Sequence, residues 1–294
     1  MTLPPRVFTR RSVLKTAALG LAALPAFRAN GAQSSAVPAP AGAAPTEGGL
    51  RLGVATYSTR MMSFDATIEA LKALRVANTG VYKAHLNWET VSVDEARAAG
   101  EKLRAAGIAL TGSGVVALPN DEAKCRKAFE NVKAAGMVTM VCKPEPAVLP
   151  MIEKLVREFD QKIAIHNHGP EDKVYPSPAE VWAAIKDLDP RIGFCLDVGH
   201  AMRAKADSAA AIRQHATRIY DVHLKDSLAQ PGAMADIPTE IGTGHMDIRG
   251  ILQALREVKY TGVVAIEYEK GGGNPLIGLS ESLGYVRGLL KAMT

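Results

Sequence analysis

Eight short apolar runs alternate with amphipathic stretches along the sequence, and this alternation constrains the fold more than any other feature. The apolar runs occupy residues 50–57, 80–84, 108–116, 138–142, 163–165, 192–196, 220–224 and 263–266. The amphipathic stretches occupy residues 66–74, 93–106, 122–135, 148–159, 178–188, 206–215, 248–258 and 279–293. Wholly apolar runs are typical of strands buried on both faces, and helix-length spacers indicate parallel connections. The sequence therefore predicts an α/β fold, a single (β/α)8 TIM barrel over residues 50–294.

An open, doubly wound sheet is the alternative to the barrel. Such a sheet usually carries a glycine-rich phosphate-binding turn after its first strand, and the residues that follow 50–57 contain none. Eight strand candidates in about 245 residues also match the usual size of a closed barrel. The barrel is therefore the favoured prediction.

The N-terminal segment has the features of an export signal. Arg10 and Arg11 precede an apolar run of small residues at 17–27, which is the order typical of a twin-arginine leader. The run is shorter than the roughly 20 apolar residues that span a membrane. We expect residues 1–32 to be a twin-arginine signal peptide and residues 33–49, rich in Ala, Pro, Ser and Gly, to be a disordered linker. The mature protein is then expected in the periplasm or another extracytoplasmic space, without stable membrane insertion.

Most of the positive charge lies outside the predicted barrel. Of the formal net charge of +5, residues 1–49 carry +4 from five basic side chains and one acidic side chain, which leaves +1 for residues 50–294. A nearly neutral domain lacks the basic surface that nucleic-acid binding needs. We therefore expect no nucleic-acid partner.

Metal-competent side chains stand at the ends of the last four predicted strands, where barrels build their sites. Imidazole is the commonest metal ligand, and a carboxylate at the end of a buried strand is costly unless it is paired or bound to a cation. Two nitrogens and two oxygens suit Mn, Fe, Co, Ni or Zn better than calcium. A structural metal is the alternative, but ligands from four strand ends leave positions open for a substrate. We expect one divalent transition metal bound by His166, Asp197, His223 and Glu267.

Two aspartates, Asp197 and Asp247, have two possible roles each, as a metal ligand or as the N-cap of a helix. The next amphipathic stretch after Asp197 begins only near Ala206, so we interpret Asp197 as a ligand. Asp247 stands directly before the stretch at 248–258 and is predicted to cap that helix.

Further polar side chains near these strand ends are candidates for acid–base catalysis. His168 lies two residues after His166 and therefore shares its face of the strand. Lys225 shares a face with His223, and its charge could stabilise a developing oxyanion; a surface lysine is the alternative. Glu269 lies further out and is a weaker candidate. The residues predicted to take part in catalysis are Glu267, His168, His200, Glu145 and Lys225.

At these residues the sequence resembles the xylose isomerase-like barrel superfamily of sugar isomerases and epimerases, from about residue 50 to the C-terminus. The resemblance lies in an Asp before Gly-His, a His in a His-hydrophobic-Lys-Asp strand end, and a Glu on the last strand, here Asp197, His223 and Glu267. It implies a small-molecule sugar as substrate and proton removal next to a carbonyl, through an enediolate and with a metal polarising the oxygen. The loop at 242–244 is similar to the family's glycine turn near the substrate, which implies that Gly244 contacts the sugar.

His166 departs from the family's pattern, because many family epimerases have a metal-binding glutamate on the fifth strand. Their paired-glutamate proton shuttle then lacks one partner, and a one-base mechanism fits a lyase as well. The His-Asn-His-Gly-Pro-Glu-Asp segment at 166–172 and the Glu-Tyr-Glu at 267–269 most resemble an exported branch that includes enzymes acting on 3-keto-glycosides. We expect a sugar isomerase or epimerase. A 3-keto-glycoside lyase or hydratase and a non-catalytic exported sugar-binding protein are the alternatives.

Substrate contacts are expected from the loops at the barrel mouth. Lys143 follows the fourth predicted strand and is expected to contact the substrate; the alternative is a loop residue without a function. Trp88 and Tyr57 are aromatic residues in loops and could stack on a sugar ring. With Gly244, these are the predicted substrate-binding residues. The sequence does not decide whether the protein forms a homo-oligomer, because the outer helices of a barrel can pair without a recognisable motif.

Overall fold

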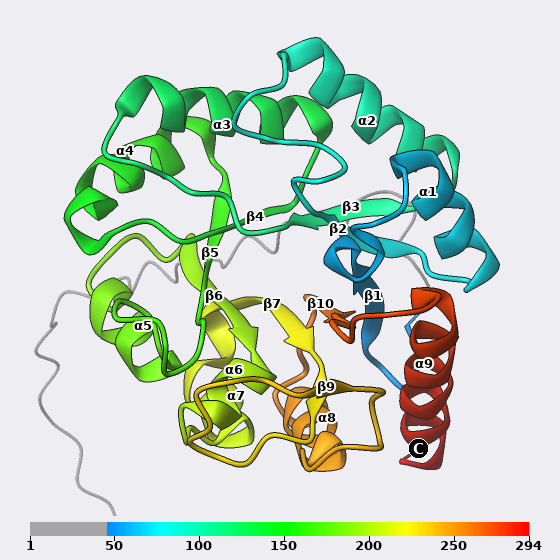
Figure 1. Cartoon of the computed structure of the whole chain (residues 1–294). Helices are drawn as coiled ribbons and strands as arrows, with labels where there is room; N and C mark the ends of the chain where they lie inside the picture. The colour runs from blue at the N-terminus through cyan, green and yellow to red at the C-terminus, as the bar shows by residue number, and fades with distance from the viewer. Residues whose placement is uncertain (1–45, 294) are drawn as a thin grey trace, which may run out of the picture. The chain divides into compact units, whose positions relative to one another are not determined.

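The computed structural model describes residues 46–293, and at their centre eight parallel strands form a barrel surrounded by helices (Figure 1). The barrel strands are β1 (Arg51–Ala55), β2 (Asn78–Val81), β3 (Ala109–Ser113), β4 (Thr139–Cys142), β5 (Lys162–His166), β6 (Ile192–Asp197), β7 (Ile219–Leu224) and β10 (Val263–Ile266). Each overlaps one of the apolar runs in the sequence. The predicted TIM barrel is therefore confirmed.

The strands follow the order β3-β2-β1-β10-β7-β6-β5-β4, with parallel neighbours throughout. The barrel closes between β3 and β4 through Val116, which follows β3. Val116 N donates to Val141 O at 3.0 Å, and Lys143 N donates to Val116 O at 3.1 Å. Because all eight strands are parallel, their C-terminal ends meet at the same end of the barrel.

The helices lie outside the strands (Figure 1). They are α1 (Phe64–Ala73), α2 (Val93–Ala105), α3 (Glu122–Ala135), α4 (Leu149–Phe159), α5 (Pro178–Ile185), α6 (Val198–Arg203), α7 (Ser208–His215), α8 (Ile248–Glu257) and α9 (Pro275–Ala292). Short 3-10 helices occur at η1 (Thr56–Thr59), η2 (Pro146–Val148) and η3 (Ala216–Arg218).

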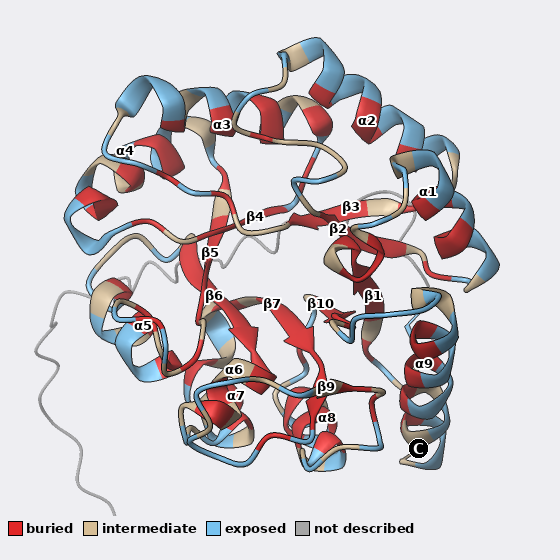
Figure 2. Cartoon of the chain, viewed as in Figure 1, coloured by how far each residue is buried: buried red, intermediate tan, exposed pale blue. Residues whose placement is uncertain are grey.

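The core lies between the strands and the inner faces of the helices. Figure 2 shows the strands buried, while the outer helices alternate buried and exposed residues along their length. In α8 the buried residues Ile248, Ile251, Leu252 and Leu255 recur at helical spacing. Burying each such side chain contributes about 1.5–3 kcal/mol. Asp247 caps this helix by accepting a backbone hydrogen bond of 2.9 Å in the first turn, which confirms its predicted role.

Two short elements were not expected from the sequence. Helix α6 follows β6 directly, and Asp197 is its N-cap, with Oδ1 accepting from His200 N at 2.8 Å. The prediction that no helix begins near Asp197 was therefore wrong, because a helix of six residues is too short to show periodicity. The second element is an antiparallel pair of two-residue strands, β8 (Asp226–Ser227) and β9 (Pro238–Thr239), between β7 and α8.

The predicted signal peptide at 1–32 and most of the predicted linker at 33–49 lie outside the described residues. The end of that linker is ordered: Glu47 and Leu50 exchange backbone hydrogen bonds of 2.8 and 3.0 Å. The Glu47 carboxylate also accepts from Arg287 of α9 at 3.0 Å. Within residues 46–293, no helix has both the length and the apolar character needed to cross a membrane.

Candidate active site

Four metal-competent side chains come together at the C-terminal ends of the strands. His166 ends β5, Asp197 ends β6, His223 lies on β7 and Glu267 follows β10. The register pairs Asp197 with His223, so both side chains leave the barrel at one level. All four residues are buried, and one nitrogen or oxygen of each lies within 4.8 Å of the others. The structure therefore brings the four predicted ligands into one cluster.

The distances inside this cluster suit a shared cation. His166 Nε2 lies 3.2 Å from His223 Nδ1 and 3.4 Å from Asp197 Oδ2. His223 Nδ1 lies 3.2 Å from Glu267 Oε2 and 4.0 Å from Asp197 Oδ2. Four ligands at about 2.0–2.2 Å from one ion stand roughly 3.3–3.6 Å apart in a tetrahedral arrangement. Three of the four measured separations are close to this range.

The environment of Asp197 also fits a cation. The residue is 0% exposed, and its Oδ1 serves as the α6 cap. Its Oδ2, which faces the cluster, lies 2.8 Å from Lys225 Nζ and 3.4 Å from His166 Nε2. A buried carboxylate needs compensating positive charge, and a metal ion in the cluster would add to the charge of Lys225. The cluster is therefore consistent with a divalent metal site, and its mixed nitrogen and oxygen donors suit transition metals.

Lys225 lies against the carboxylates of the cluster. Its Nζ is 2.8 Å from Asp197 Oδ2 and 2.8 Å from Glu267 Oε2, and it forms an ion pair with Glu269. Burial would lower the pKa of Lys225, but the three carboxylates raise it well above its usual value. The side chain is only 3% exposed, so the alternative of a surface lysine is wrong. Lys225 is also not among the residues that line the cavity described below.

The carboxylates around Lys225 differ in pKa. Burial would raise the pKa of Asp197, but His200 and Lys225 outweigh it and hold that pKa well below its usual value. Burial would likewise raise the pKa of Glu267, but the imidazole of His223 and the ammonium of Lys225 hold this pKa well below its usual value. For Glu269 burial prevails: it raises the pKa to about 7 against the lowering effect of Lys225.

Two further histidines stack beside the cluster, His168 and His200, with ring centroids 5.4 Å apart. His168 Nδ1 lies 3.2 Å from His166 Nδ1, which leaves His166 Nε2 for the cluster. His200 Nδ1 accepts from the Arg203 guanidinium at 2.6 Å. Because arginine only donates, the neutral His200 ring carries its proton on Nε2. Burial lowers the pKa of His168 to about 4 and that of His200 to about 3, so both rings are neutral at pH 7.

Arg203 is a site residue that the sequence analysis missed. It is buried on α6 and donates to Glu171 through Nη1 at 2.7 Å and Nη2 at 2.6 Å. It also donates to Met234 O at 2.8 Å. Arg203 thus ties His200 to the loop after β5 and to the loop after β7. Its position in the sequence offers no signal of this role, because its partners lie about 30 residues away on both sides.

A cavity of about 580 Å³ opens at the C-terminal ends of the strands. One part of its wall consists of the histidines and carboxylates of β5 to β10, namely His166, His168, His200, His223, Glu267 and Glu269. The rest comes from the loops after β1 to β4, namely Tyr57, Tyr82, Lys83, Gly114, Val115, Ala117, Lys143 and Glu145. The cluster therefore lies where a small polar molecule in the cavity could reach it.

The structure places the predicted substrate-binding residues differently. Tyr57 and Lys143 line the cavity, whereas Trp88 and Gly244 do not. Trp88 is 1% exposed, and its indole N–H donates to a backbone carbonyl at the end of β2 at 2.9 Å. Gly244 N donates to Asp226 Oδ2 at 3.0 Å, within the loop between β9 and α8. Both therefore act in the packing of their own loops.

Other cavity residues were missed although their sequence positions carry a signal. Tyr82 and Lys83 directly follow β2, as the predicted ligands follow their own strands. The Tyr82 ring meets Tyr57 edge to face, with centroids 4.8 Å apart. Asp172, which does not itself line the cavity, ends the segment at 166–172 and forms an ion pair with the cavity residue Lys143. Polar or aromatic residues just after a strand thus mark cavity positions on the early strands as well as on the late ones.

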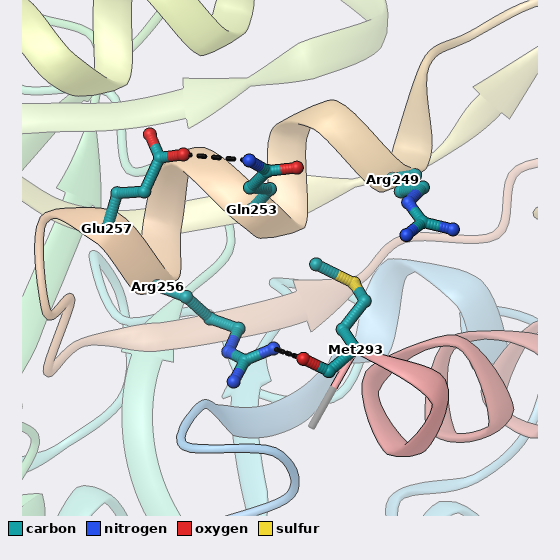
Figure 3. A pocket seen from close by; sticks show the side chains of 5 residues that line it. All are labelled: Arg249, Gln253, Arg256, Glu257 and Met293. Atoms are coloured by element: carbon teal, nitrogen blue, oxygen red, sulfur yellow. Dashed lines mark hydrogen bonds between the residues drawn. The ribbon is translucent and has the colours of Figure 1, made fainter.

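A second hollow, of about 470 Å³, lies on the outer wall of the barrel (Figure 3). It is lined by Arg249, Gln253, Arg256 and Glu257 of α8 and by Met293 at the end of α9. Gln253 donates to Glu257 at 2.9 Å, and Arg256 donates to Met293 O at 2.8 Å. This lining offers a single carboxylate and no histidine. The chemistry therefore concentrates at the strand ends and not here.

Comparison with known proteins bears on the fold and the family. Residues 147–289 match the family described as xylose isomerase-like TIM barrel. No curated protein matches the chain. Among solved structures, the chain is similar to an uncharacterized protein from Parabacteroides distasonis, with 23% identity and a TM-score of 0.63; the match covers 84% of this chain and 100% of the other.

Two solved sugar epimerases are similar as well. The apo 3-keto-D-glucoside 4-epimerase YcjR of E. coli has 13% identity and a TM-score of 0.66, over 81% of this chain and 99% of its own. D-psicose 3-epimerase in the presence of D-fructose has 19% identity and a TM-score of 0.64, over 83% of this chain and 98% of its own. Such identities show a shared fold. The chain therefore has a TIM-barrel fold, and its residues 147–289 are similar to the xylose isomerase-like TIM barrel family.

Proposed function

We propose that the protein is a metal-dependent isomerase or epimerase that removes a proton next to the carbonyl group of a sugar or keto-sugar. The observation that carries the proposal is the buried cluster of His166, Asp197, His223 and Glu267 beside a polar cavity. Two proteins of the same fold are sugar epimerases by name, which supports the same class of reaction. Because one fold hosts many activities, the cluster and not the fold is the main support.

The four cluster residues would hold one divalent ion, and Mn, Co, Fe, Ni and Zn all accept two imidazoles with two carboxylates. A bound ion of this kind polarises a substrate oxygen and stabilises the negative charge that develops when the neighbouring C–H proton leaves.

His200 is suited to donating a hydrogen bond and not to removing a proton. Its Nδ1 is occupied by Arg203, so its Nε2 carries the proton beside the cavity. A substrate oxygen that gains negative charge would accept this hydrogen bond. Lys143, oriented by its ion pair with Asp172, adds a positive charge to the same wall.

The proton acceptor is then sought among the carboxylates that line the cavity, Glu145, Glu267 and Glu269. Glu267 belongs to the cluster. Glu145 follows β4 and Glu269 follows β10, and these two strands are four positions apart in the ring of eight, on opposite sides of the barrel. An epimerase exchanges protons on two faces of a sugar. We therefore propose Glu145 and Glu269 as the two proton-transfer groups.

A 3-keto-glycoside lyase or hydratase is the second candidate function. It is favoured by His166, because β5 contributes no carboxylate to the cavity. Removal of the proton beside the keto group would then expel the glycosidic oxygen, and one base is enough to start that elimination. Glu269 would be this base.

NMR of sugars in D2O separates the candidates. Deuterium at the carbon next to the carbonyl, without loss of the aglycone, supports the isomerase or epimerase. Release of the aglycone with an unsaturated keto sugar supports the lyase. Saturable binding of a sugar without exchange at any carbon would contradict both and favour a non-catalytic sugar-binding protein.

Elemental analysis tests the metal site independently of substrate. We expect about one transition metal per chain in the wild type, and less in His166→Ala, Asp197→Ala, His223→Ala and Glu267→Ala. His245→Ala is the matched control, because His245 is exposed on the loop before α8 and lies outside the cluster. Equal metal content in all variants would contradict the proposed centre.

We also propose that the protein is exported to the periplasm or another extracytoplasmic space. The support is the Arg10-Arg11 pair before an apolar run, in residues outside the described part of the chain. Cell fractionation tests it: the wild type is expected outside the cytoplasm, and a variant with Arg10→Lys and Arg11→Lys inside. Equal distribution of the two would contradict the twin-arginine signal.

A further inference from the structure

The strand ends carry three overlapping groups of metal-competent side chains. One is the cluster already described, and another joins two of its histidines, His166 and His223, to Cys195. The remaining one, the second group, consists of Asp197, His200 and Glu269, and one ligand atom of each lies within 4.8 Å of the others. Asp197 belongs to both the cluster and the second group. Pairs of metal ions are bound about 3.5–4 Å apart in many enzymes. The two carboxylates of the second group would attract a second ion, and His200 would bind it only if Arg203 released Nδ1, because the neutral ring carries its proton on Nε2.

The Lys225 ammonium fills the space between these two groups. Its Nζ lies 2.8 Å from Asp197 Oδ2, 2.8 Å from Glu267 Oε2 and in contact with Glu269 Oε1. Asp197 and Glu269 are two of the three members of the second group. The ammonium thus already pairs with two of the carboxylates that a second cation would need.

The fold makes room for the Lys225 side chain at Gly199. A Cβ atom at position 199 would lie 2.7 Å from both Cγ and Cδ of Lys225. Contacts of that length do not occur, so any other residue at 199 would displace the lysine stem. The position of the ammonium therefore depends on two separate segments: Lys225 follows β7, and Gly199 lies in the first turn of α6.

We propose that the Lys225 ammonium takes the place of a second metal ion and keeps the centre mononuclear. The proposal rests on the metal site proposed above. Three carboxylates, Asp197, Glu267 and Glu269, contact the ammonium and carry at most three negative charges. Lys225 and a single divalent ion together supply three positive charges. A second divalent ion beside Lys225 would therefore leave the group with an excess of positive charge.

Lys225 is in this view a positioning residue that acts through the carboxylates. By holding Glu269 it keeps that carboxylate out of the metal's coordination shell. Glu269 then stays at the cavity wall, where a proton-transfer group is needed. The same ion pairs orient Asp197 and Glu267 toward the cluster.

The test replaces Lys225 by methionine, which keeps most of the length of the side chain and removes its charge. Purified wild-type and variant proteins are dialysed against Mn²⁺, and bound metal per chain is measured by elemental analysis. Manganese EPR then distinguishes single ions from coupled pairs. We expect one Mn²⁺ per chain in the wild type and two, magnetically coupled, in Lys225→Met.

Two further variants make the result specific. Adding Glu269→Gln to Lys225→Met is expected to return the stoichiometry to one, because it removes a carboxylate of the second group. Lys143→Met is the matched control, because Lys143 pairs with Asp172 and not with a cluster carboxylate. It should keep one Mn²⁺. The double variant with Glu269→Gln also restores the charge balance, so it provides a charge-matched reference for the metal content of Lys225→Met.

Other outcomes overturn the proposal. The proposal is overturned if the wild type binds two Mn²⁺ ions. It is also overturned if a folded Lys225→Met protein binds one Mn²⁺ ion with the affinity of the wild type, because the ammonium would then not exclude a second metal ion. Two ions in Lys225→Met with Glu269→Gln would show that the second group is not the one that Lys225 fills. A wild type that binds no metal would instead contradict the proposed metal site itself.

Discussion

Asp226 organises the loop between β7 and α8, and its replacement by asparagine gives a sharp test of the structure. The residue is 1% exposed. Its Oδ1 accepts from Ser227 N at 2.9 Å and Met246 N at 3.2 Å, and its Oδ2 from Gly242 N at 2.9 Å and Gly244 N at 3.0 Å. In Asp226→Asn one oxygen becomes an NH2 group. Whichever way the amide turns, this donor faces two backbone donors.

The structure sets the size of the effect. Each hydrogen bond to a charged acceptor contributes about 1.5–3 kcal/mol, so loss of two would cost roughly 3–6 kcal/mol if nothing moved. Gly242 is exposed and can turn its N–H to water, which reduces the loss. We expect the free energy of unfolding to fall by about 3 kcal/mol. In a domain of this size that corresponds to a melting temperature about 6–12 °C lower.

Thermal melting and urea unfolding, both followed by far-UV circular dichroism, measure this change. Asp247→Asn is the matched control, because Asp247 is exposed and accepts one backbone hydrogen bond at the start of α8. Asparagine caps a helix about as well as aspartate, so its effect should stay below about 0.5 kcal/mol. An Asp226→Asn protein that melts within about 2 °C of the wild type would refute the reasoning.

Three further predictions test other parts of the structure. Trp88→Phe removes a buried hydrogen bond and part of an indole ring, and we expect about 2 kcal/mol lower stability with unchanged metal content; loss of metal instead would mean that Trp88 reaches the site. Arg203→Met removes the donor to His200 Nδ1, so ¹⁵N NMR should show the ring proton shared between both nitrogens; a pure Nε2–H form would contradict that role. Lys270 holds the pKa of Glu240 down to about 2, so the ion pair stabilises the fold above the usual pKa of 4.5, and this contribution is lost as pH falls through about 2. The stability advantage of the wild type over Glu240→Gln should therefore shrink between pH 4.5 and 2, and an advantage independent of pH would speak against it.

The barrel and its metal-competent residues could be predicted because each has a local signature. A strand buried on both faces needs an apolar run, and a polar residue that ends such a run must lie at the mouth. His166, Asp197, His223 and Glu267 all meet this criterion, and the structure brings them together. Local sequence is enough where burial and strand direction decide the position.

Features that depend on distant parts of the chain could not be predicted. Strand alternation placed Lys225 on the inner face, but the path of its stem depends on Gly199, which lies in the first turn of α6. The indole of Trp88 turns into the core because a free carbonyl at the end of β2 accepts its N–H. Arg203 finds partners on two loops far away in sequence. Such contacts follow from packing in three dimensions, which a pattern along the chain does not contain.

The unequal wall of the cavity has a consequence for how this scaffold can change over evolution. The metal-competent residues come from β5 to β10, whereas Tyr57, Tyr82, Lys83, Val115 and Ala117 come from the loops after β1 to β3. None of these five residues belongs to the metal-competent groups found within residues 46–293. Substitution at these five positions can change the shape of the cavity while the metal-competent residues stay the same. A protein with this layout can therefore change which molecules its cavity accepts without losing the residues that could hold a metal.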